Sequence, residues 1–365
     1  MTESFSYKDA GVLDSHQIGL SRLLKWVSKT NELRSNVGKA LLEPKYFANV
    51  VKIDEKQGIA IATDGVGTKI ILAELMEKYD TVGIDCVAMN ANDILCIGAT
   101  PISMVDYIAV EEAKPDVLEE LAKGFYEGAK QAQISIAGGE VAQLGDMIKG
   151  ATAGSGFDLV GTCIGLVKLD EIIIGQDLRE GDVVVGLESS GIHSNGLSLA
   201  RKVLLEEANL SLDQIFPEMG CTLGEELLRP TKIYVREITD MFSKGLKIKA
   251  LAHITGDGFL NLLRTERNVS YRIDSLPPCP PIFSLIQEKG NVTTGEMFRV
   301  FNMGIGFCVV ADPSSADQVI SIARDHGTKA HILGQVVEKP ASQIEIIPKK
   351  LIGKGKNFRG QVSTS

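Results

Sequence analysis

Acidic residues at the ends of apolar segments are the clearest chemical signal in this sequence. Asp64 follows the apolar run 58–62 in ATDGVGTK, and Glu140 ends ISIAGGE. Asp85 and Asp93 lie eight positions apart, which on a helix is only about 80° around the axis, so both can face one cleft. Magnesium takes hard oxygen ligands, often one or two carboxylates together with substrate phosphates. The acids therefore suit magnesium–nucleotide chemistry, although any one of them alone is more commonly a turn or helix-start residue.

Glycines accompany these acids and strengthen the same interpretation. Gly65 and Gly67 follow Asp64, and Gly139 directly precedes Glu140. Glycine allows backbone amides to approach an anion closely, and Lys69 could offer a point charge to a phosphate. The sequence contains neither a Walker A motif nor a G-x-G-x-x-G turn that opens a helix. A nucleotide site here would thus differ from the two commonest types.

A second polar cluster, SSGIHSNGLSLARK at 189–202, follows the apolar run 183–188. Ser194 is a plausible N-cap, and a helix start rich in Ser, Gly and Asn can bind an anion. His193 lies in this loop, either as a surface histidine bonded to backbone or as a group for acid–base work. His253, in LAHITGDGF, is the other histidine beside a glycine–acid turn. No G-x-S-x-G elbow supports covalent acyl chemistry.

Alternating strands and helices must position these groups. Hydrophobic periodicity and helix-stop signals predict helices over 15–30, 81–98, 114–133, from Ser194 to about Ala208, over 225–243 despite Pro230, and near 315–326. Strands are predicted over 58–63, 102–110, 134–140, 156–167 and 182–188. Acid- and glycine-bearing loops at strand ends favour two α/β or α+β domains.

The length of 365 residues also suggests two domains. The sequence pattern changes near Leu169, where glycine–aspartate turns begin to separate apolar segments that are predicted to be strands. We predict a first domain over 1–168 for ATP binding and dimerisation, and a second over 169–345 on the substrate side. The basic, glycine-containing stretch 346–365 is predicted to be a flexible tail, with contact to a phosphate as the alternative.

Composition excludes several classes of protein. With 44% hydrophobic and 23% charged residues, the chain is typical of a soluble globular protein. A net charge of -9 argues against nucleic acid or an anionic membrane as the main partner. The six cysteines are scattered without a C-x-x-C pair, which is typical of free thiols in a reducing cytosol, so a cytoplasmic protein is expected. No apolar run reaches about 18 residues, so no membrane-spanning helix is expected.

Taken together, the segments resemble the phosphoribosylformylglycinamidine cyclo-ligase family, also called aminoimidazole ribonucleotide synthetases. The resemblance extends in order from residue 6 to about 338. It is carried by SYKDAGV, TDGVGTK, DTVGIDCVAMNANDILCIGATP, VDYIAV, GGE, SSGIHSNGLSLARK, PTKIYV, AHITGDGF and GNVTTGEMFRVFNMGIGF. The run Asp93-x-x-x-x-Gly98-Ala99-x-Pro101 matches the nucleotide-binding signature of the wider superfamily.

This resemblance implies a fold and a reaction. Family members have two α/β domains and form a homodimer through the N-terminal domain, whose strands build a barrel across the dimer, with the active site between domains and subunits. They convert formylglycinamidine ribonucleotide and ATP into aminoimidazole ribonucleotide, ADP and phosphate, in purine synthesis. ATP activates the formyl amide oxygen as a phosphoryl ester, and the amidine nitrogen then closes the imidazole ring. Mg²⁺ is required and K⁺ is typical.

The resemblance also implies residue roles. The expected magnesium ligands are Asp64, Asp93, Glu140 and, with less support, Asp85. The expected nucleotide contacts are Lys8, Asp9, Asp64, Gly65, Gly67, Thr68, Lys69, Asp93 and Gly139. The expected contacts of the phosphoribosyl substrate are Ser190, His193, Ser194, Asn195, Asn291, Glu296 and Asn302. The residues expected to act in the reaction are His193 as proton carrier, and Lys69 and Asp93 at the transferred phosphoryl group.

Three departures from the family pattern bear on these roles. The region before the first conserved strand reads NELRSNVGKALLEPKYF and lacks the usual glycine-rich loop. Gln143 stands where a second carboxylate is usual, and Asp257 replaces a glycine. The alternatives are another superfamily enzyme, such as a thiamine monophosphate kinase or a selenide, water dikinase, and a non-catalytic ATP-binding scaffold on the same fold.

Overall fold

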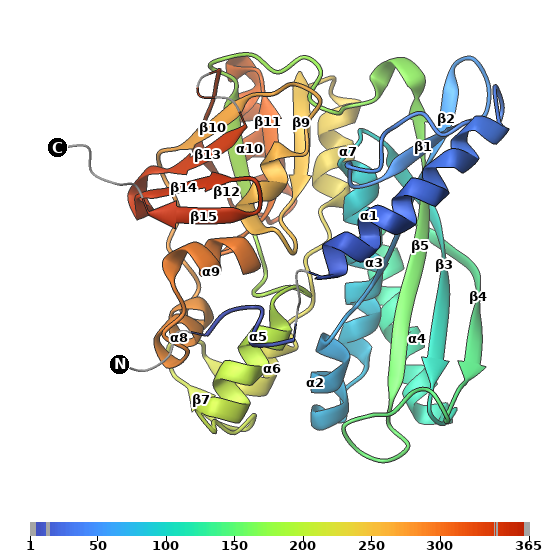
Figure 1. Cartoon of the computed structure of the whole chain (residues 1–365), viewed down its shortest axis with the longest axis vertical. Coiled ribbons are helices and arrows are strands. Elements are labelled where there is room, and N and C mark those ends of the chain that lie inside the picture. Colours follow the sequence, from blue (N-terminus) through green and yellow to red (C-terminus); the bar gives the residue numbers. More distant parts are fainter. Residues whose placement is uncertain (1–4, 12–14, 339, 341, 361–365) are drawn as a thin grey trace.

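Two β-sheets, each covered by helices, lie side by side in the computed structural model (Figure 1). The structure describes residues 5–11, 15–338, 340 and 342–360. The first sheet and its helices are built from residues 49–168, and the second sheet from residues 183–360. The predicted two-domain α/β architecture, with mixed sheets, is confirmed.

The first sheet has five strands in the order β1-β2-β5-β3-β4, antiparallel except for β3 and β4. Its strands are β1 (Asn49–Lys52), β2 (Gln57–Gly65), β3 (Thr100–Val110), β4 (Ser135–Gln143) and β5 (Phe157–Lys168). Three helices cover one face, namely α2 (Lys69–Met76), α3 (Asp80–Leu95) and α4 (Pro115–Ala132). Alternation along β2 buries Ala60 and Ala62 beneath the helices, while Ile61 between them is exposed on the other face.

Helices α3 and α4 pack closely because glycines stand where they meet. A Cβ added at Gly124 would overlap the carbonyl of Asp80, and one added at Gly83 would lie 2.6 Å from the carbonyl oxygen of Leu121. Leu121 and Phe125 complete the buried stripe of α4. Helix α3, which carries Asp85 and Asp93, is thus fixed between α4 and the sheet.

The second sheet has eight strands in the order β15-β14-β13-β10-β12-β6-β11-β9. The strands are β6 (Val183–Glu188), β9 (Ile248–His253), β10 (Ser270–Ile273), β11 (Ile305–Ala311), β12 (Ala330–Val337), β13 (Gln343–Ile346), β14 (Leu351–Lys354) and β15 (Asn357–Gly360). Both faces are buried: Val185 and Leu187 join a core shared with the first domain, while Val184 and Val310 belong to a second core. A separate ribbon pairs β7 (Ile215–Phe216) with β8 (Cys221–Thr222).

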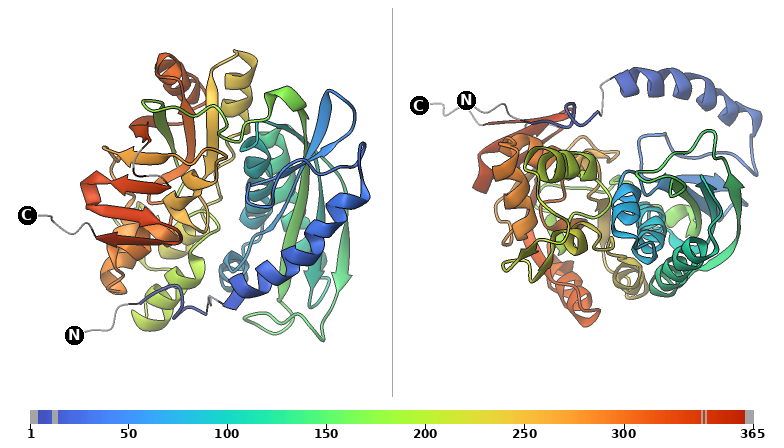
Figure 2. Two further views of the ribbon diagram at one scale, coloured as in Figure 1. Left: turned by 45° about the horizontal axis from the view of Figure 1, so that its top comes forward. Right: turned by 90° about the horizontal axis from the view of Figure 1, so that it is seen from below.

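The remaining helices are mostly short. They are α1 (Ser15–Val27), α5 (Leu197–Arg201) with a π-helical continuation (Lys202–Glu207), α6 (Leu223–Leu227), α7 (Val235–Ser243), α8 (Pro281–Lys289), α9 (Thr294–Val300) and α10 (Ala316–Asp325). Short 3-10 segments lie at Ser28–Leu33, Leu169–Glu171, Gly258–Leu263, Pro313–Ser315 and Ile347–Lys349. Helix α1 lies outside the two sheets, and Figure 2 shows it alongside the first domain. No described helix is long and apolar enough to cross a membrane.

Three predictions about these elements are wrong. The predicted helix 225–243 is two helices, α6 and α7, because Pro230 lacks the N–H that a continuous helix needs. The helix predicted from Ser194 begins at Leu197, and Ser194 does not cap it. The stretch from 346 is not a flexible tail where it is described, since β14 and β15 extend the second sheet and bury Leu351 and Phe358; residues 361–365 lie outside the described residues.

Candidate active site

A cavity of about 230 Å³ lies where β2 ends, α2 begins and the loop before α5 approaches from the second domain. It is lined by Tyr7, Asp64, Gly65, Val66, Gly67, Thr68, Met89, Ser194, Asn195, Gly196, Leu197 and Ser198. A hydrogen bond of 2.9 Å between the hydroxyls of Thr68 and Ser198 joins its two sides. The structure therefore brings together the two polar clusters that are about 130 residues apart in the chain.

Asp64 is held in this cavity by helix α3. The side-chain amide of Asn90 accepts a bond from the Asp64 N–H (2.9 Å) and donates one to the Asp64 carbonyl (3.1 Å). Strand alternation turns Asp64 to the face that α3 covers. Burial, and to a smaller extent the nearby Asp93 carboxylate, raise the pKa of Asp64 to about 6. The site thus concentrates negative charge that a bound cation would relieve.

This raised pKa makes the stability of the ligand-free protein depend on pH. Between about pH 4 and pH 6 the folded protein binds more protons at Asp64 than the unfolded chain does, so its free energy of unfolding falls as pH rises through this window. Asp64→Asn removes that contribution. We therefore expect the free energy of unfolding of the variant, relative to that of the wild type, to rise by on the order of 2 kcal/mol between pH 4 and pH 7. Urea unfolding in EDTA measures the difference. A difference that is the same at every pH would contradict the prediction.

Asp93 is positioned by His253, a residue whose role could not be inferred from the sequence. The Nδ1 atom of His253 lies 2.9 Å from an Asp93 carboxylate oxygen, and the imidazole is fully buried. Because a carboxylate oxygen accepts, Nδ1 is the donor, and Nε2 faces the side-chain amide of Asn92 at 3.4 Å. Asn92 in turn accepts a 3.0 Å bond from the N–H of Tyr234. Side chains and backbone from both domains therefore orient Asp93.

The start of helix α2 borders the cavity beside Asp64. Gly67 has φ of +70°, which other residues rarely adopt, and a Cβ there would meet nothing within 4 Å. The first amides that bond within the turn are those of Ile70 and Ile71, to the carbonyls of Gly67 and Thr68. The preceding amides are the kind of donors that bind phosphate at a helix N-terminus.

Lys69 and Asp85 form a buried ion pair with each other, contrary to the roles expected of them. Their charged atoms are 2.8 Å apart and both side chains are fully buried. The Lys69 ammonium also donates to the carbonyl of Arg229 (2.6 Å), and Asp85 accepts from the N–H of Thr231 (2.7 Å) and the hydroxyl of Ser194 (3.2 Å). Burial lowers the pKa of Lys69, and Asp85 opposes this effect. The pair joins the two domains, and neither group is free to hold phosphate or metal.

His193 is a structural residue in this arrangement and not an exposed proton carrier. Its Nε2 atom accepts from the N–H of Ser190 (3.2 Å) and of Lys232 (3.4 Å). Burial lowers the pKa of His193 well below its usual value, so the ring is neutral. The Ser190 hydroxyl is itself bonded to the carbonyl of Pro230 (2.5 Å). Ser190 and His193 fix the loop, and neither side chain lines the cavity.

Asn302, expected to contact substrate, instead holds the same loop from behind. Its amide donates to the carbonyls of Gly191 (2.8 Å) and Ile192 (3.0 Å). Its oxygen accepts from the N–H of Gly304 (2.8 Å) and the hydroxyl of Ser189 (3.1 Å). With Asn302 buried and all its polar atoms engaged, the remaining candidates for substrate contact in this loop are Asn195 and the backbone beside it.

Glu140 and Gly139 lie apart from the cavity. Gly139 shares a row across the sheet with Asp64, but two strands separate them. Glu140 is opposite Tyr107, one residue out of that row, so it points to the uncovered face of the sheet, away from Asp64. Within the part of the chain that the structure describes, no three His, Cys, Asp or Glu side chains are grouped to hold a metal. The predicted cluster of Asp64, Asp93 and Glu140 is therefore not assembled in one chain.

The N-terminal segment reaches the cavity through Tyr7. The Tyr7 N–H donates to Glu296 (2.7 Å), which also forms an ion pair with Arg299 (2.5 Å), and the backbone of Gly196 donates to the Tyr7 hydroxyl. Lys8 and Asp9 are exposed, and Asp9 accepts from the N–H of Ser6 (2.8 Å). Asn291 follows Gly290, whose carbonyl accepts a bond from the Phe5 N–H (3.2 Å), and Asn291 does not line the cavity. Glu296 thus anchors the segment that places Tyr7 at the site.

The structure also places the two residues that depart from the family pattern. Gln143 ends β4, where its side-chain oxygen accepts from the N–H of Ala113 at 3.2 Å. Asp257 forms an ion pair with Arg264 at 3.0 Å. Neither replacement adds a free carboxylate to the cavity.

Comparison with known proteins identifies the class that this fold and site define. Residues 47–167 match the family "AIR synthase related protein, N-terminal domain", and residues 179–347 match the corresponding C-terminal domain. The match over both sheets supports one two-domain architecture.

Close relatives specify the family further. The chain is 48% identical over 350 residues to a phosphoribosylformylglycinamidine cyclo-ligase of Methanocaldococcus jannaschii, with 96% of each chain covered. It is 46% identical to the corresponding protein of Methanobrevibacter smithii, covering 91% of this chain and 95% of that one. The chain belongs to the phosphoribosylformylglycinamidine cyclo-ligase family.

More distant solved structures share the fold alone. The HypE–HypF complex contains a chain with a TM-score of 0.59 at 18% identity, covering 86% of this chain and 93% of that one. A thiamine-monophosphate kinase of Stenotrophomonas maltophilia gives 0.56 at 16% identity, with 88% and 95% covered. T. maritima PurL complexed with ADP gives 0.54 at 16% identity, with 84% and 44% covered.

Proposed function

We propose that this chain catalyses the ATP-dependent cyclisation of formylglycinamidine ribonucleotide to aminoimidazole ribonucleotide, with release of ADP and phosphate, in purine biosynthesis. The observation that carries the proposal is the 48% identity to a cyclo-ligase along 96% of both chains. The cavity between the domains has Asp64 and the start of α2 in its wall, and Asp93 lies near enough to raise the pKa of Asp64; these groups are suited to phosphoryl transfer.

Asp64 and Asp93 would hold Mg²⁺. Their carboxylates are the hard oxygen donors that this ion prefers, and a cation would offset the burial and the nearby Asp93 charge that together raise the pKa of Asp64. When bound, the ion would neutralise charge on the transferred phosphoryl group. The two carboxylates match the small number of protein ligands that Mg²⁺ commonly takes alongside substrate phosphates. No described residue indicates where K⁺ would bind, so K⁺ stays a proposal from the family.

We assign the phosphates of ATP to the backbone amides at the start of α2, next to Gly65, Gly67 and Thr68. The pairing of Lys69 with Asp85 argues against this role for the Lys69 ammonium. Asn195 and the backbone of Ser194 would contact the phosphoribosyl substrate from the opposite wall. Lys8 and Asp9 follow Tyr7 on the N-terminal segment and could approach the nucleotide from solvent.

In this assignment the protein acts chiefly by alignment. The formyl amide oxygen takes the terminal phosphoryl group of ATP, and the amidine nitrogen then attacks the activated carbon and expels phosphate. Asp93, fixed by His253, keeps its orientation while charge moves between the substrates. The burial of His193, which keeps its ring neutral, argues against a role for it as the proton carrier.

A direct assay tests the function. Purified protein with formylglycinamidine ribonucleotide, ATP, Mg²⁺ and K⁺ is expected to release ADP and aminoimidazole ribonucleotide in equal amounts. ADP formed without the cyclised product would refute the cyclo-ligase assignment and favour another phosphoryl-transfer reaction on this fold. No ADP at all would favour the scaffold alternative.

We further propose that two copies associate through the uncovered face of the five-stranded sheet. That face exposes apolar side chains on three strands: Ile61 (38%), Val105 (45%), Tyr107 (42%) and Leu166 (43%). Contiguous exposed apolar surface of this kind marks protein–protein contact. Glu140 points to the same face, so association would carry it towards the partner. Such association would make 1–168 the dimerising domain and would form the barrel across the dimer. We propose separately that 169–345 lies on the substrate side, since it carries Asn195 in the wall of the cavity.

Val105→Asp is expected to convert the dimer into monomers at micromolar concentration, because dimerisation would bury an unpaired charge. Sedimentation velocity measures the change. Ile215→Asp is the matched control, since Ile215 is 68% exposed in the second domain, and it is expected to leave the dimer intact. A dimer that survives Val105→Asp would place the interface elsewhere.

A cytoplasmic location is also proposed. All six cysteines are free thiols in the structure, as expected in a reducing compartment.

A further inference from the structure

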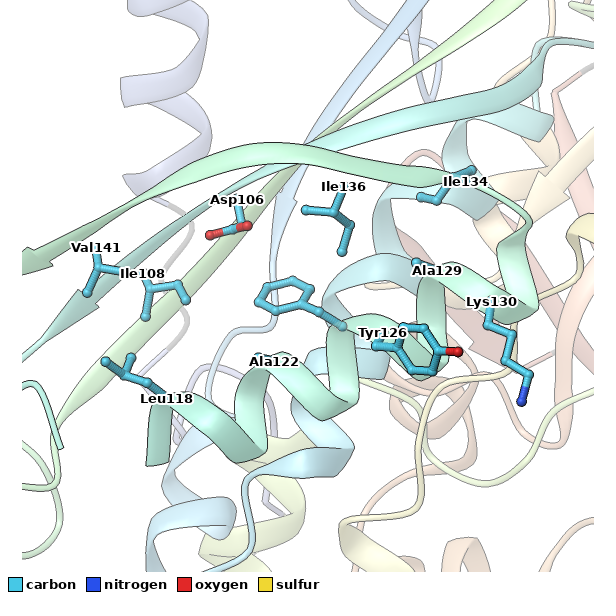
Figure 3. A pocket seen from close by; sticks show the side chains of 11 residues that line it. Asp106, Ile108, Leu118, Ala122, Tyr126, Ala129, Lys130, Ile134, Ile136 and Val141 are labelled. Carbon is cyan, nitrogen blue, oxygen red and sulfur yellow. The ribbon is translucent and has the colours of Figure 1, made fainter. Parts of the chain in front are cut away.

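A second, larger cavity of about 670 Å³ lies between helix α4 and strands β3 and β4, apart from the candidate active site (Figure 3). No residue lines both cavities. Most of the wall is apolar: it includes Ile108 and Val141 from the sheet, and Phe125 and Tyr126 from α4. Cavities of this size and character commonly bind small organic molecules.

One carboxylate interrupts this apolar lining. Asp106 points from β3 into the space between the sheet and α4, beside Ile108 and Ile136 (Figure 3). Among the described residues, none forms an ion pair with Asp106 or donates a side-chain hydrogen bond to it. Burial raises the pKa of this carboxyl group, in agreement with an environment that offers no compensating charge.

The glycine opposite Asp106 leaves room for the carboxylate. Gly139 is paired with Asp106 across the parallel strands β3 and β4, and a Cβ at position 139 would overlap the Asp106 carboxyl group. A larger residue at this position would therefore displace Asp106 from its place at the cavity wall. Ile136 and Val141, on either side of Gly139 along β4, supply the apolar surface around it.

The cavity does not close by movement of α4 towards the sheet. Helix α4 is held on its other side by the contacts of Gly124 with Asp80 and of Gly128 with Val87, where an added Cβ would come within 2.9 Å. These contacts, in which glycines of α4 let the two helices approach closely, fix α4 against α3. The space is thus preformed, which lowers the cost of filling it.

We propose that this cavity is a binding site for a small aromatic amine, whose ring packs between α4 and the sheet and whose ammonium group pairs with Asp106. An apolar body suits the lining residues, and a single cationic donor suits one carboxylate that lacks a partner. The charged group at the mouth, Lys130, is engaged with Glu127 at 3.6 Å and leaves Asp106 as the uncompensated charge. The site is independent of the proposed cyclo-ligase reaction.

Isothermal titration calorimetry with two compounds of the same shape tests the proposal. We expect 2-phenylethylamine to bind the wild-type protein at least tenfold more tightly than the neutral 2-phenylethanol, and Asp106→Asn to abolish that difference. Ala122→Phe, which adds a ring at an exposed position on the cavity wall, is expected to weaken both compounds at least tenfold.

Several results would overturn the proposal. They are equal affinity for the amine and the alcohol, an unchanged amine affinity in Asp106→Asn, and no measurable binding of either compound at millimolar concentration. Amine binding that persists in Ala122→Phe would place the ligand at another site. Circular dichroism and cyclo-ligase activity of each variant show whether the fold is retained, because none of these residues lines the candidate active site.

Discussion

Asp93→Asn is expected to lower the turnover number of the cyclisation by about 100- to 1,000-fold, the usual effect of removing one preorganised electrostatic group. The change keeps the size of the side chain and leaves an oxygen that can accept the hydrogen bond from His253. In the wild type, His253 Nδ1 lies 2.9 Å from the Asp93 carboxylate oxygen. What it removes is one of the two negative charges that, in the proposed function, hold Mg²⁺. The loss is measured as release of ADP and aminoimidazole ribonucleotide at saturating substrates.

The control for this variant is Asp213→Asn, which removes one carboxylate from an exposed turn of the second domain. It is expected to keep wild-type activity. Both variants should retain the wild-type sedimentation coefficient and circular dichroism spectrum. If Asp93→Asn keeps activity within about threefold of the wild type, Asp93 is not part of the metal and phosphate site.

Lys69→Met is expected to reduce the free energy of unfolding by about 3–5 kcal/mol, because it leaves the buried Asp85 carboxylate without its partner. Urea titration at one fixed protein concentration measures the change. Lys123→Met removes a lysine of similar length from an exposed ion pair with Glu119, where both side chains are 64% exposed. This control is expected to cost less than about 1 kcal/mol.

A second substitution separates the ion pair from other effects of the lysine. In Lys69→Met/Asp85→Asn no charge remains buried, and the asparagine oxygen can still accept from the N–H of Thr231. We expect the double variant to recover more than half of the lost stability. If Lys69→Met instead leaves stability unchanged and abolishes activity, then Lys69 contacts a phosphate and not Asp85 during the reaction.

The raised pKa of Asp64 and the buried pair of Asp85 show two different uses of a carboxylate in one site. Asp64 forms no ion pair with any residue that the structure describes, so its ionised form destabilises the ligand-free fold. Asp85, eight residues before Asp93 on α3, is neutralised by Lys69 and contributes to the contact between domains. The difference arises from the side chain that each acid meets: Asp85 meets the Lys69 ammonium, whereas Asp64 meets the neutral amide of Asn90 and the nearby Asp93 carboxylate.

Local patterns and extended similarity determined the fold and the family. Alternation of buried and exposed residues along β2, and the apolar stripe of α4, are periodic signals that can be recognised in the chain itself. The shared segments in their order identified the cyclo-ligase family, which the 48% identity confirms, while the run from Asp93 to Pro101 matched the signature of the wider superfamily. The predicted helix boundaries differ from the structure near Pro230 and Leu197, where a proline or a short helix interrupts the hydrophobic periodicity.

The role of each polar residue was decided by contacts that the sequence does not encode locally. Lys69 meets Asp85 and a carbonyl 160 residues further on, and His193 accepts from the backbone of Lys232, 39 residues away. Glu140 follows its glycines as predicted, but the register with β3 turns it away from Asp64. Residue type and spacing thus determined which groups could do the chemistry. Only the tertiary structure decided which of them remain free, because burial and long-range partners set the charge and orientation of each group.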